Sequence, residues 1–166
     1  SKNEMISNIK GVLTPKLETK GFIVRKAIPK NGEGSGIIIE NEDIGNKKKI
    51  MIKKSKDYSK QYNLDDEFKF SGWFTSSESE LNEYHGYIFA VYKDSVPTYF
   101  VFDREDMKVI LNQKTVDSKG KYHFYLAEDK SGQYFDHRDG GLLLTENVES
   151  WEKIERIIEN ILIGFQ

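Results

Sequence analysis

The sequence lacks cysteine, contains only 3 prolines among its 166 residues and has no long hydrophobic run. Without cysteine the chain cannot form a disulfide framework, a thiolate metal site or a cysteine nucleophile, and it suits a reducing compartment. No apolar segment approaches the roughly 20 residues of a membrane-spanning helix, and the first residues lack the pattern of a signal peptide. We therefore expect a soluble cytoplasmic protein that does not contact a membrane.

The chain also lacks a strong excess of either charge, since its formal net charge is -2. Such a protein does not attract polyanions over its whole surface, so any contact with nucleic acid must come from a local basic patch. In contrast, 37% of the residues are hydrophobic, and 10 Phe, 9 Tyr and 2 Trp supply bulky side chains for a core. Because there is no repeat, linker or break in composition, we expect a single domain over residues 1–166.

Apolar residues at helical spacing predict helices over residues 4–19, 103–111 and 148–163, and a short polar helix is predicted at 78–84. In the first helix Asn3 is the expected N-cap, Gly21 ends the segment, and Pro15 should kink or shorten it because its ring removes a backbone donor. Asp103 is the expected N-cap of the helix over 103–111. The last helix should bury one apolar face, which consists of Val148, Trp151, Ile154, Ile157, Ile158 and Ile161.

Runs of β-branched and aromatic residues predict strands at 22–24, 37–39, 50–52, 68–74, 86–92, 98–102 and 122–126. The second and third of these runs flank Asp43-Ile44-Gly45-Asn46, which is good turn chemistry, so we expect a β-hairpin. This hairpin should place residue 37 opposite residue 52 or 53, and Gly36 beside Lys53. The element order favours an α/β (α+β) fold, in which N-terminal, middle and C-terminal helices flank a central mixed sheet.

Two predicted strands carry motifs that resemble those of a nuclease superfamily. Residues 34–39 (GSGIII) are similar to a glycine, any residue, an aspartate and then an apolar strand, and residues 50–55 (IMIKKS) to an apolar residue, Glu or Gln, an apolar residue, Lys and then Thr or Ser. In this order they resemble the PD-(D/E)XK, or restriction-endonuclease-like, superfamily. The later strands, the helix at Asp103 and the Trp151-bearing last helix resemble elements of small members, so the resemblance covers most of the chain. It implies a restriction-endonuclease-like core.

The sequence departs from this superfamily at the residues that hold its metal. The first metal-binding aspartate falls on Gly36 and the second acidic position on Met51, so only Lys53 of the signature remains. The superfamily's chemistry needs carboxylates to hold a divalent cation at the scissile phosphate, while the lysine orients or activates water. The resemblance therefore implies a catalytically degenerate nuclease with no cofactor. If the domain is active, Mg²⁺ is the implied cofactor, and Glu33 and Glu18 are candidate metal ligands.

Lysines are densest in and after the second strand of the predicted hairpin. The basic residues of this stretch are Lys47, Lys48, Lys49, Lys53, Lys54, Lys56 and Lys60. Lys53 is the candidate catalytic residue, and Lys49, Lys54 and Ser55 are candidate phosphate-binding residues. Because strand side chains alternate, Lys49 and Lys53 should share one face, and Lys54 should take the other. A second interpretation is that these lysines only keep the hairpin soluble and protect it from edge pairing.

Other polar groups do not form a recognised site. The Gly-rich segment 32–36 leads into a strand, so it lacks the helix N-terminus of a phosphate loop, and we interpret His85, His123 and His137 as structural. Two functions follow. The first is a nuclease-fold domain of a DNA-processing or restriction and defence system that acts through nucleic-acid binding, with DNA as the expected partner. The alternative is a protein-binding module, such as an immunity or assembly protein, with no nucleic-acid role.

Overall fold

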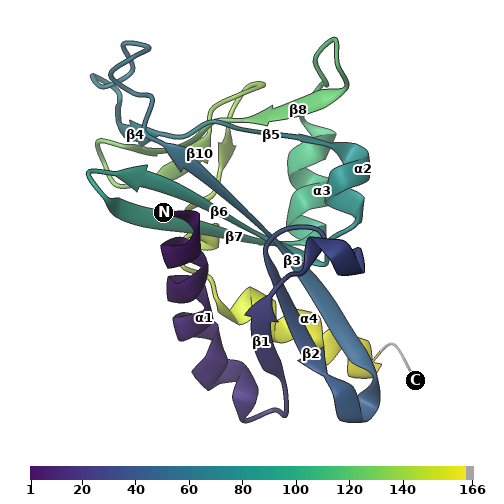
Figure 1. The fold of residues 1–166 in the computed structure, drawn as a ribbon. Helices are drawn as coiled ribbons and strands as arrows, with labels where there is room; N and C mark the ends of the chain where they lie inside the picture. Colours follow the sequence, from purple (N-terminus) through teal and green to yellow (C-terminus); the bar gives the residue numbers. More distant parts are fainter. Residues whose placement is uncertain (164–166) are drawn as a thin grey trace.

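A computed structural model describes the backbone of residues 1–163 and the side chains up to residue 159 (Figure 1). The α-helices are α1 (Lys2–Glu18), α2 (Glu78–Asn82), α3 (Arg104–Asn112) and α4 (Glu152–Ile163). The strands are β1 (Ile23–Lys26), β2 (Ile37–Asn41), β3 (Asn46–Lys56), β4 (Phe68–Ser71), β5 (Phe74–Ser77), β6 (Gly86–Lys93), β7 (Val96–Asp103), β8 (Lys121–Phe124), β9 (Leu126–Asp129), β10 (Tyr134–Asp136) and β11 (Leu142–Leu143). Within this part of the chain, no helix is long and apolar enough to cross a membrane.

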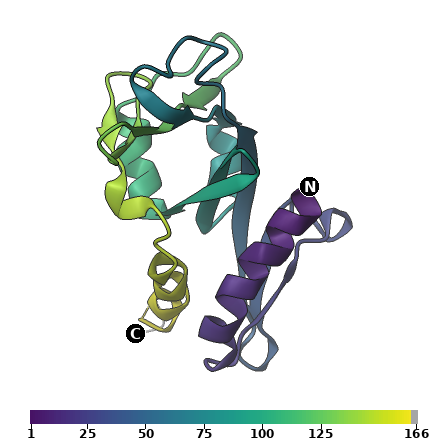
Figure 2. The same cartoon turned by 90° about the vertical axis from the view of Figure 1, so that its left-hand side faces the viewer.

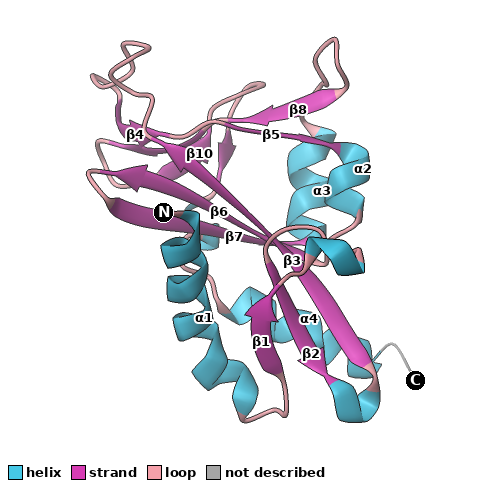
Figure 3. Cartoon of the chain, in the orientation of Figure 1, coloured by secondary structure: helices cyan, strands magenta, loops and turns pink. Residues whose placement is uncertain are grey.

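A five-stranded mixed sheet in the order β1-β2-β3-β6-β7 forms the centre of the fold (Figure 3). Its neighbours pair antiparallel except for β3 and β6, which are parallel. The predicted α/β fold with a central mixed sheet is confirmed at this level. Two smaller sheets, β11-β10-β9-β4 and β5-β8, lie at the upper end of Figure 1.

The predicted strands at 68–74 and 122–126 are each divided between the two smaller sheets. Residues 68–71 form β4 and pair with β9, whereas residues 74–77 form β5 and pair with β8. The break in the first strand falls at Gly72, where an added Cβ atom would overlap the side chain of Val91. The backbone therefore packs closely on β6 at the point where the chain leaves one sheet and enters the other.

The central sheet separates two apolar clusters because side chains alternate along its strands. On one face, Ile88 and Ala90 of β6 pack with the apolar sides of α1 and α4. On the other face, Tyr87, Phe89 and Val91 pack with α2, α3 and the smaller sheets. In Figure 2, α1 (purple) and α4 (yellow) both lie in the lower half of the molecule, at opposite sides of the view. Burial on both faces accounts for the unbroken apolar run of β6 in the sequence.

The first helix begins earlier than predicted. Ser1 is its N-cap, and the Ser1 hydroxyl accepts a hydrogen bond of 3.3 Å from the amide of Glu4. Asn3, the predicted cap, lies within the first turn, where its side chain accepts a hydrogen bond of 3.0 Å from Lys26 Nζ. Pro15 does not shorten the helix, which continues to Glu18 because the buried apolar side of α1 holds its last turn against the sheet.

The last helix begins later than predicted, at Glu152, so Val148 and Trp151 precede it. Trp151 is 8% exposed, and its ring centroid lies 5.3 Å from that of Tyr99 on β7, which confirms its burial against the sheet. Val148 does not share this face, because it forms a bridge with Phe100 and packs in the cluster on the other side. The side chain of Ile161 lies outside the described residues.

The predicted helix at 103–111 is confirmed, and Asp103 caps it. The Asp103 carboxylate accepts a hydrogen bond of 2.8 Å from the amide of Asp106, and the Asp106 carboxylate accepts one of 3.0 Å from the amide of Asp103. This reciprocal capping box satisfies two backbone donors that the start of a helix otherwise leaves unpaired.

The predicted hairpin of β2 and β3 is present, but its register differs from the prediction. Ile37 pairs with Ile50, whereas residue 52 or 53 was expected. A 3-10 turn over Glu42–Ile44 and the left-handed Gly45 close the hairpin at the pair Asn41 and Asn46, so the turn is centred earlier in the chain. Gly36 consequently lies against the backbone of residues 50–52 and not beside Lys53.

Candidate functional site

The position of the expected metal cage contains no carboxylate. A Cβ atom on Gly36 would overlap the Ile50 carbonyl oxygen and lie 3.1 Å from the Ile52 amide nitrogen. With a φ of +113°, Gly36 also adopts a conformation that residues with a side chain rarely take. Across the hairpin, Met51 is 2% exposed and belongs to the apolar cluster beneath α2. An aspartate therefore does not fit at Gly36 on this backbone, and Met51 fills the adjoining space with apolar atoms.

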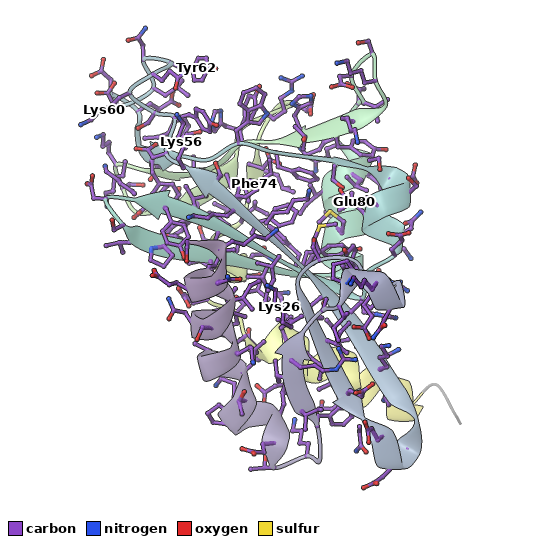
Figure 4. The ribbon with its side chains drawn as sticks, viewed as in Figure 1. Lys26, Lys56, Lys60, Tyr62, Phe74 and Glu80 are labelled. Atoms are coloured by element: carbon purple, nitrogen blue, oxygen red, sulfur yellow. The ribbon has the colours of Figure 1, made fainter. Side chains whose placement is uncertain are left out.

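Lys53 forms an ion pair with a carboxylate that the sequence does not reveal. Its Nζ atom lies 3.3 Å from Oε1 of Glu80, which belongs to α2 on one face of the sheet (Figure 4). The hydroxyl of Ser76 donates a hydrogen bond to the same oxygen. Burial would raise the pKa of Glu80, but the hydrogen bond from Ser76 and the charge of Lys53 together lower it. Lys53 is therefore a partly neutralised cation.

Glu33 is fixed by other charged groups and is remote from the Lys53 pair. Its buried carboxylate accepts hydrogen bonds of 2.8 and 2.7 Å from the Arg25 guanidinium and one of 2.9 Å from the Ile28 amide. Lys47 also contacts it. The hydrogen bonds from Arg25, Lys47 and Ile28 hold the pKa of Glu33 far below its usual range. This arrangement fastens the loop before β2 to β1.

The second candidate metal ligand, Glu18, is exposed at the C-terminal end of α1, and its side chain forms no hydrogen bond or ion pair with the described residues. The structure does not bring Glu18, Glu33 and Lys53 together. Among the described residues, no group of three or more His, Asp or Glu side chains has a geometry that would hold a metal ion.

The candidate phosphate contacts on β3 are divided between the two faces of the sheet and have partners of their own. Lys49 Nζ donates a hydrogen bond of 3.2 Å to the carbonyl of Gly32, and Lys54 Nζ lies 4.7 Å from the centre of the Tyr92 ring. Ser55 is buried, and its hydroxyl donates to the carbonyl of Lys56. The same hydroxyl accepts a hydrogen bond of 2.9 Å from the backbone amide of Trp73.

An apolar hollow of about 430 Å³ opens beyond the end of β3, where the chain enters the loop over residues 57–67. Such a volume lies within the range of about 300–1,000 Å³ that is typical of ligand sites. It is lined by Tyr58, Tyr62, Leu64, Ser71, Gly72, Trp73, Tyr125 and His137. We call this cavity the aromatic hollow.

Trp73 is the central ring of the aromatic hollow and is 38% exposed. Its ring meets Tyr58 and Tyr125 edge-on, at centroid distances of 5.8 and 6.3 Å, and stacks on His123 at 5.9 Å. The indole N–H donates a hydrogen bond of 3.0 Å to Nδ1 of His123, whose Nε2 lies 2.8 Å from the Asp117 carboxylate. This chain of contacts fixes the orientation of the indole ring.

Asp57 holds the opposite wall of the aromatic hollow. One of its carboxylate oxygens accepts hydrogen bonds of 2.8 Å from the amide of Ser59 and 2.9 Å from the amide of Ser71. The loop that carries Tyr58 and Tyr62 is thereby joined to β4. Tyr62 remains 52% exposed at the rim, close to Lys60 in Figure 4.

Two cations stack on rings of the aromatic hollow. Lys56 Nζ lies 4.9 Å from the centre of the Tyr58 ring, and the Arg138 guanidinium lies 5.3 Å from that of Tyr125. Arg138 also donates a hydrogen bond of 2.8 Å to the Tyr125 hydroxyl. The site therefore combines exposed aromatic faces with positive charge at its edge, an arrangement suited to flat, anionic ligands.

His137 forms part of the floor of the aromatic hollow. It stacks on Phe68 at a centroid distance of 4.6 Å, and its Nε2 lies 2.8 Å from the Ser71 hydroxyl oxygen. Burial lowers the pKa of His137, so the ring is neutral near pH 7. The adjacent Asp136 is buried against Lys114 at 2.8 Å and binds the amides of Tyr125 and Arg138, so it supports the fold.

The aromatic hollow is absent from the sequence-based predictions because its residues come from four separate segments. The only signal in the sequence is the abundance of aromatic residues, which does not reveal which of them remain exposed. No family model, curated protein or solved structure matches the chain. Its function is therefore argued from its own geometry.

Proposed function

We propose that the chain is a catalytically inactive domain of restriction-endonuclease-like fold that binds single-stranded DNA through the aromatic hollow. The observation that carries this proposal is the group of partly exposed rings around Trp73, with Lys56 and Arg138 stacked at its edge. The order of α1, the meander β1–β3 and the parallel return to β6 supports the fold assignment. A role in DNA processing or in restriction and defence follows from the same resemblance.

Aromatic faces favour single strands because unpaired bases can stack on them. Each stacked base contributes about 1–3 kcal/mol and the interaction tolerates any base, while basic groups beside the rings follow the phosphates. Lys56 and Lys60 supply such groups at the end of the molecule that carries Tyr62 (Figure 4). In duplex DNA the bases are stacked on each other, so the aromatic hollow offers duplex DNA only its charged edge.

We propose that the domain is inactive because the positions that correspond to the superfamily's active site lack its metal ligands. Gly36 offers no side chain, Met51 is buried among apolar groups, and Glu80 engages the Lys53 ammonium. A lysine without carboxylates to hold a cation cannot supply the metal's share of phosphodiester hydrolysis.

A protein-binding module is the second candidate, and a specific observation favours it. Lys47 of the basic stretch and Lys53, the candidate catalytic residue, are paired with Glu33 and Glu80. The apolar lining of the aromatic hollow also suits an aromatic or aliphatic anchor from a protein partner.

Fluorescence anisotropy of labelled dT12 at low salt separates the two candidates. We expect wild-type protein to bind dT12 more tightly than a 12-base-pair duplex. We expect Tyr62→Ala to weaken dT12 binding by about 5–150-fold, which corresponds to the loss of one stacked base. Val109→Ala is the control, since Val109 is equally exposed on α3. Absence of dT12 binding, or equal binding by Tyr62→Ala, would refute the nucleic-acid proposal and leave the protein-binding module.

A further inference from the structure

A second cavity of about 250 Å³ lies where the first half of β3 meets the start of α3 and the side of α4. It is lined by Lys48, His85, Asp103, Arg104, Glu105, Lys153, Arg156 and Ile157. We call it the basic pocket. It shares no residue with the aromatic hollow, and it gathers four cationic side chains in a chain whose net charge is -2.

The acidic residues around the basic pocket already have partners. The Asp103 carboxylate caps α3 by accepting the Asp106 amide, and Glu105 lies 3.5 Å from Lys108 on the exposed side of that helix. Lys153 is the one cation of the pocket with a recorded acidic partner, Asp106, at 3.0 Å. Among the described residues, Lys48, Arg104 and Arg156 form no ion pair with a carboxylate, although Asp103 and Glu105 belong to the same lining.

Arg104 is held by two backbone carbonyls, and no carboxylate of the described residues pairs with it. Its Nε donates a hydrogen bond of 2.8 Å to the carbonyl of Tyr84, and its Nη2 donates one of 3.3 Å to the carbonyl of Asn82. A guanidinium has five N–H donors, so most of them remain available to a ligand. The end of the loop after α2 thus fixes a planar donor group at the pocket.

Lys48 is half-buried beside this guanidinium. Burial and the charge of Arg104 both lower the pKa of Lys48. Two neighbouring cations repel each other, and partial burial strengthens this repulsion. A bound anion would offset the repulsion. Such an uncompensated pair is the pattern that recognition of phosphate uses.

His85 contributes a neutral donor to the same pocket. Its Nδ1 accepts a hydrogen bond of 3.1 Å from the Lys49 amide, so the neutral ring carries its proton on Nε2. Burial and then the charges of Lys48 and Arg104 lower the pKa of His85 to about 4. The start of α3 adds the positive end of its helix dipole.

We propose that the basic pocket binds a phosphate group through Lys48, Arg104 and Arg156, with the His85 ring N–H as a further donor. Phosphate fits better than a carboxylate because it offers up to three acceptor oxygens and a second negative charge to several converging donors. The phosphate has two possible sources, which are free inorganic phosphate and the 5′-phosphate end of a DNA strand. This site does not depend on the function proposed for the aromatic hollow.

Isothermal titration with inorganic phosphate, in a chloride buffer of constant ionic strength, tests the pocket directly. We expect saturable binding by the wild type, weakened about tenfold or more in Lys48→Gln and in Arg156→Gln, because each loses a charged hydrogen bond. Lys108→Gln is the matched control, since this exposed lysine of α3 lies outside the pocket. Neither pocket side chain forms a hydrogen bond or ion pair with the residues that the structure describes, so we expect both variants to fold.

A second titration distinguishes the sources of phosphate. In one arm, 5′-phosphorylated dT8 is compared with 5′-hydroxyl dT8 on wild type, Arg156→Gln and Tyr62→Ala. If the 5′-phosphate raises the affinity for dT8, and this increase disappears only in Arg156→Gln, the pocket binds the end of a strand. If the protein binds free phosphate but the 5′-phosphate does not raise the affinity for dT8, the pocket binds the free anion. The proposal would be overturned if the wild type showed neither phosphate binding nor a gain from the 5′-phosphate, or if both pocket variants bound phosphate as tightly as the wild type. The aromatic-hollow proposal is judged separately, on Tyr62→Ala.

Discussion

Gly36 packs so closely on Ile50 that any Cβ atom at residue 36 would overlap the Ile50 carbonyl oxygen. Because Gly36 also has a φ of +113°, we expect Gly36→Ala to destabilise the fold by about 2–4 kcal/mol, the sum of backbone strain and a steric clash. Gly32→Ala is the matched control, since Gly32 has a φ of +70° but nothing within 4 Å of its added Cβ. Urea denaturation measures both. Equal losses would show that the close contact is unimportant.

The isolated domain is expected to show no Mg²⁺-dependent cleavage of plasmid or single-stranded DNA. Neither Gly36 nor Met51 provides a carboxylate, and Glu33 is held by Arg25. Incubation with and without Mg²⁺, followed by gel electrophoresis, provides the measurement. Robust cleavage that disappears in Glu33→Ala or Glu18→Ala would restore the enzyme interpretation.

Trp151→Ala is expected to lower the free energy of unfolding by about 3–5 kcal/mol, as for a large aromatic residue removed from a core. Trp151 packs on Tyr99 and is 8% exposed. The control is Trp73→Ala, which removes the other, 38% exposed tryptophan and should cost clearly less. Chemical denaturation of both variants decides the point, and a near-wild-type Trp151→Ala would mean that the start of α4 packs differently.

Stability is expected to fall as the pH decreases from about 6.5 to about 4, partly because of His85. Its pKa is lowered to about 4 in the fold, so the unfolded chain binds its proton first, and between these pH values protonation favours unfolding. Burial lowers the pKa of His137 as well, so it adds to the same slope. Thermal melts at a series of pH values should show a shallower slope in His85→Gln, and an unchanged slope would contradict the assignment.

The affinity for dT12 should fall as the salt concentration rises, with a log–log slope of about 2 in magnitude. Lys56, Lys60 and Arg138 border the aromatic hollow. Each contact of such a cation with a phosphate of a single strand releases roughly 0.7 counterion. Lys56→Ala should reduce this slope by about 0.7. Lys53→Ala should leave it nearly unchanged, because Glu80 already pairs with Lys53. A reverse pattern would place the strand on the face of β3 where a nuclease active site was expected.

Local sequence signals predicted many elements of the fold. The apolar run of β6, the cap at Asp103 and the turn residues before β3 each fix their own segment, so these elements are where the sequence places them. The register of the hairpin was missed because it is set by the geometry of the turn, which consists of a 3-10 turn and the left-handed Gly45. The hydrophobic pattern of the sequence does not reveal this geometry.

The candidate site was much less predictable than the fold. Trp73 meets Tyr125 because β4 and β5 pair with strands from about 50 residues later in the chain, and such pairing has no local signature. The partner of Lys53 was missed for the same reason, since Glu80 reaches it from α2. The lysine-rich character of β3 was visible in the sequence, but most of those lysines have internal partners in the structure.

The parallel pairing of β3 with β6 has a consequence for how the chain folds. Ile50 pairs with Gly86, so the two halves of the central sheet join only after the intervening β4, β5 and α2 have closed a long loop. The hairpins β2–β3 and β6–β7 involve near neighbours and carry a much smaller entropic cost of closure. We expect these hairpins to form early and the pairing of β3 with β6 to be the slow step. Before that pairing forms, Phe89 and Val91 of β6 would be exposed to solvent.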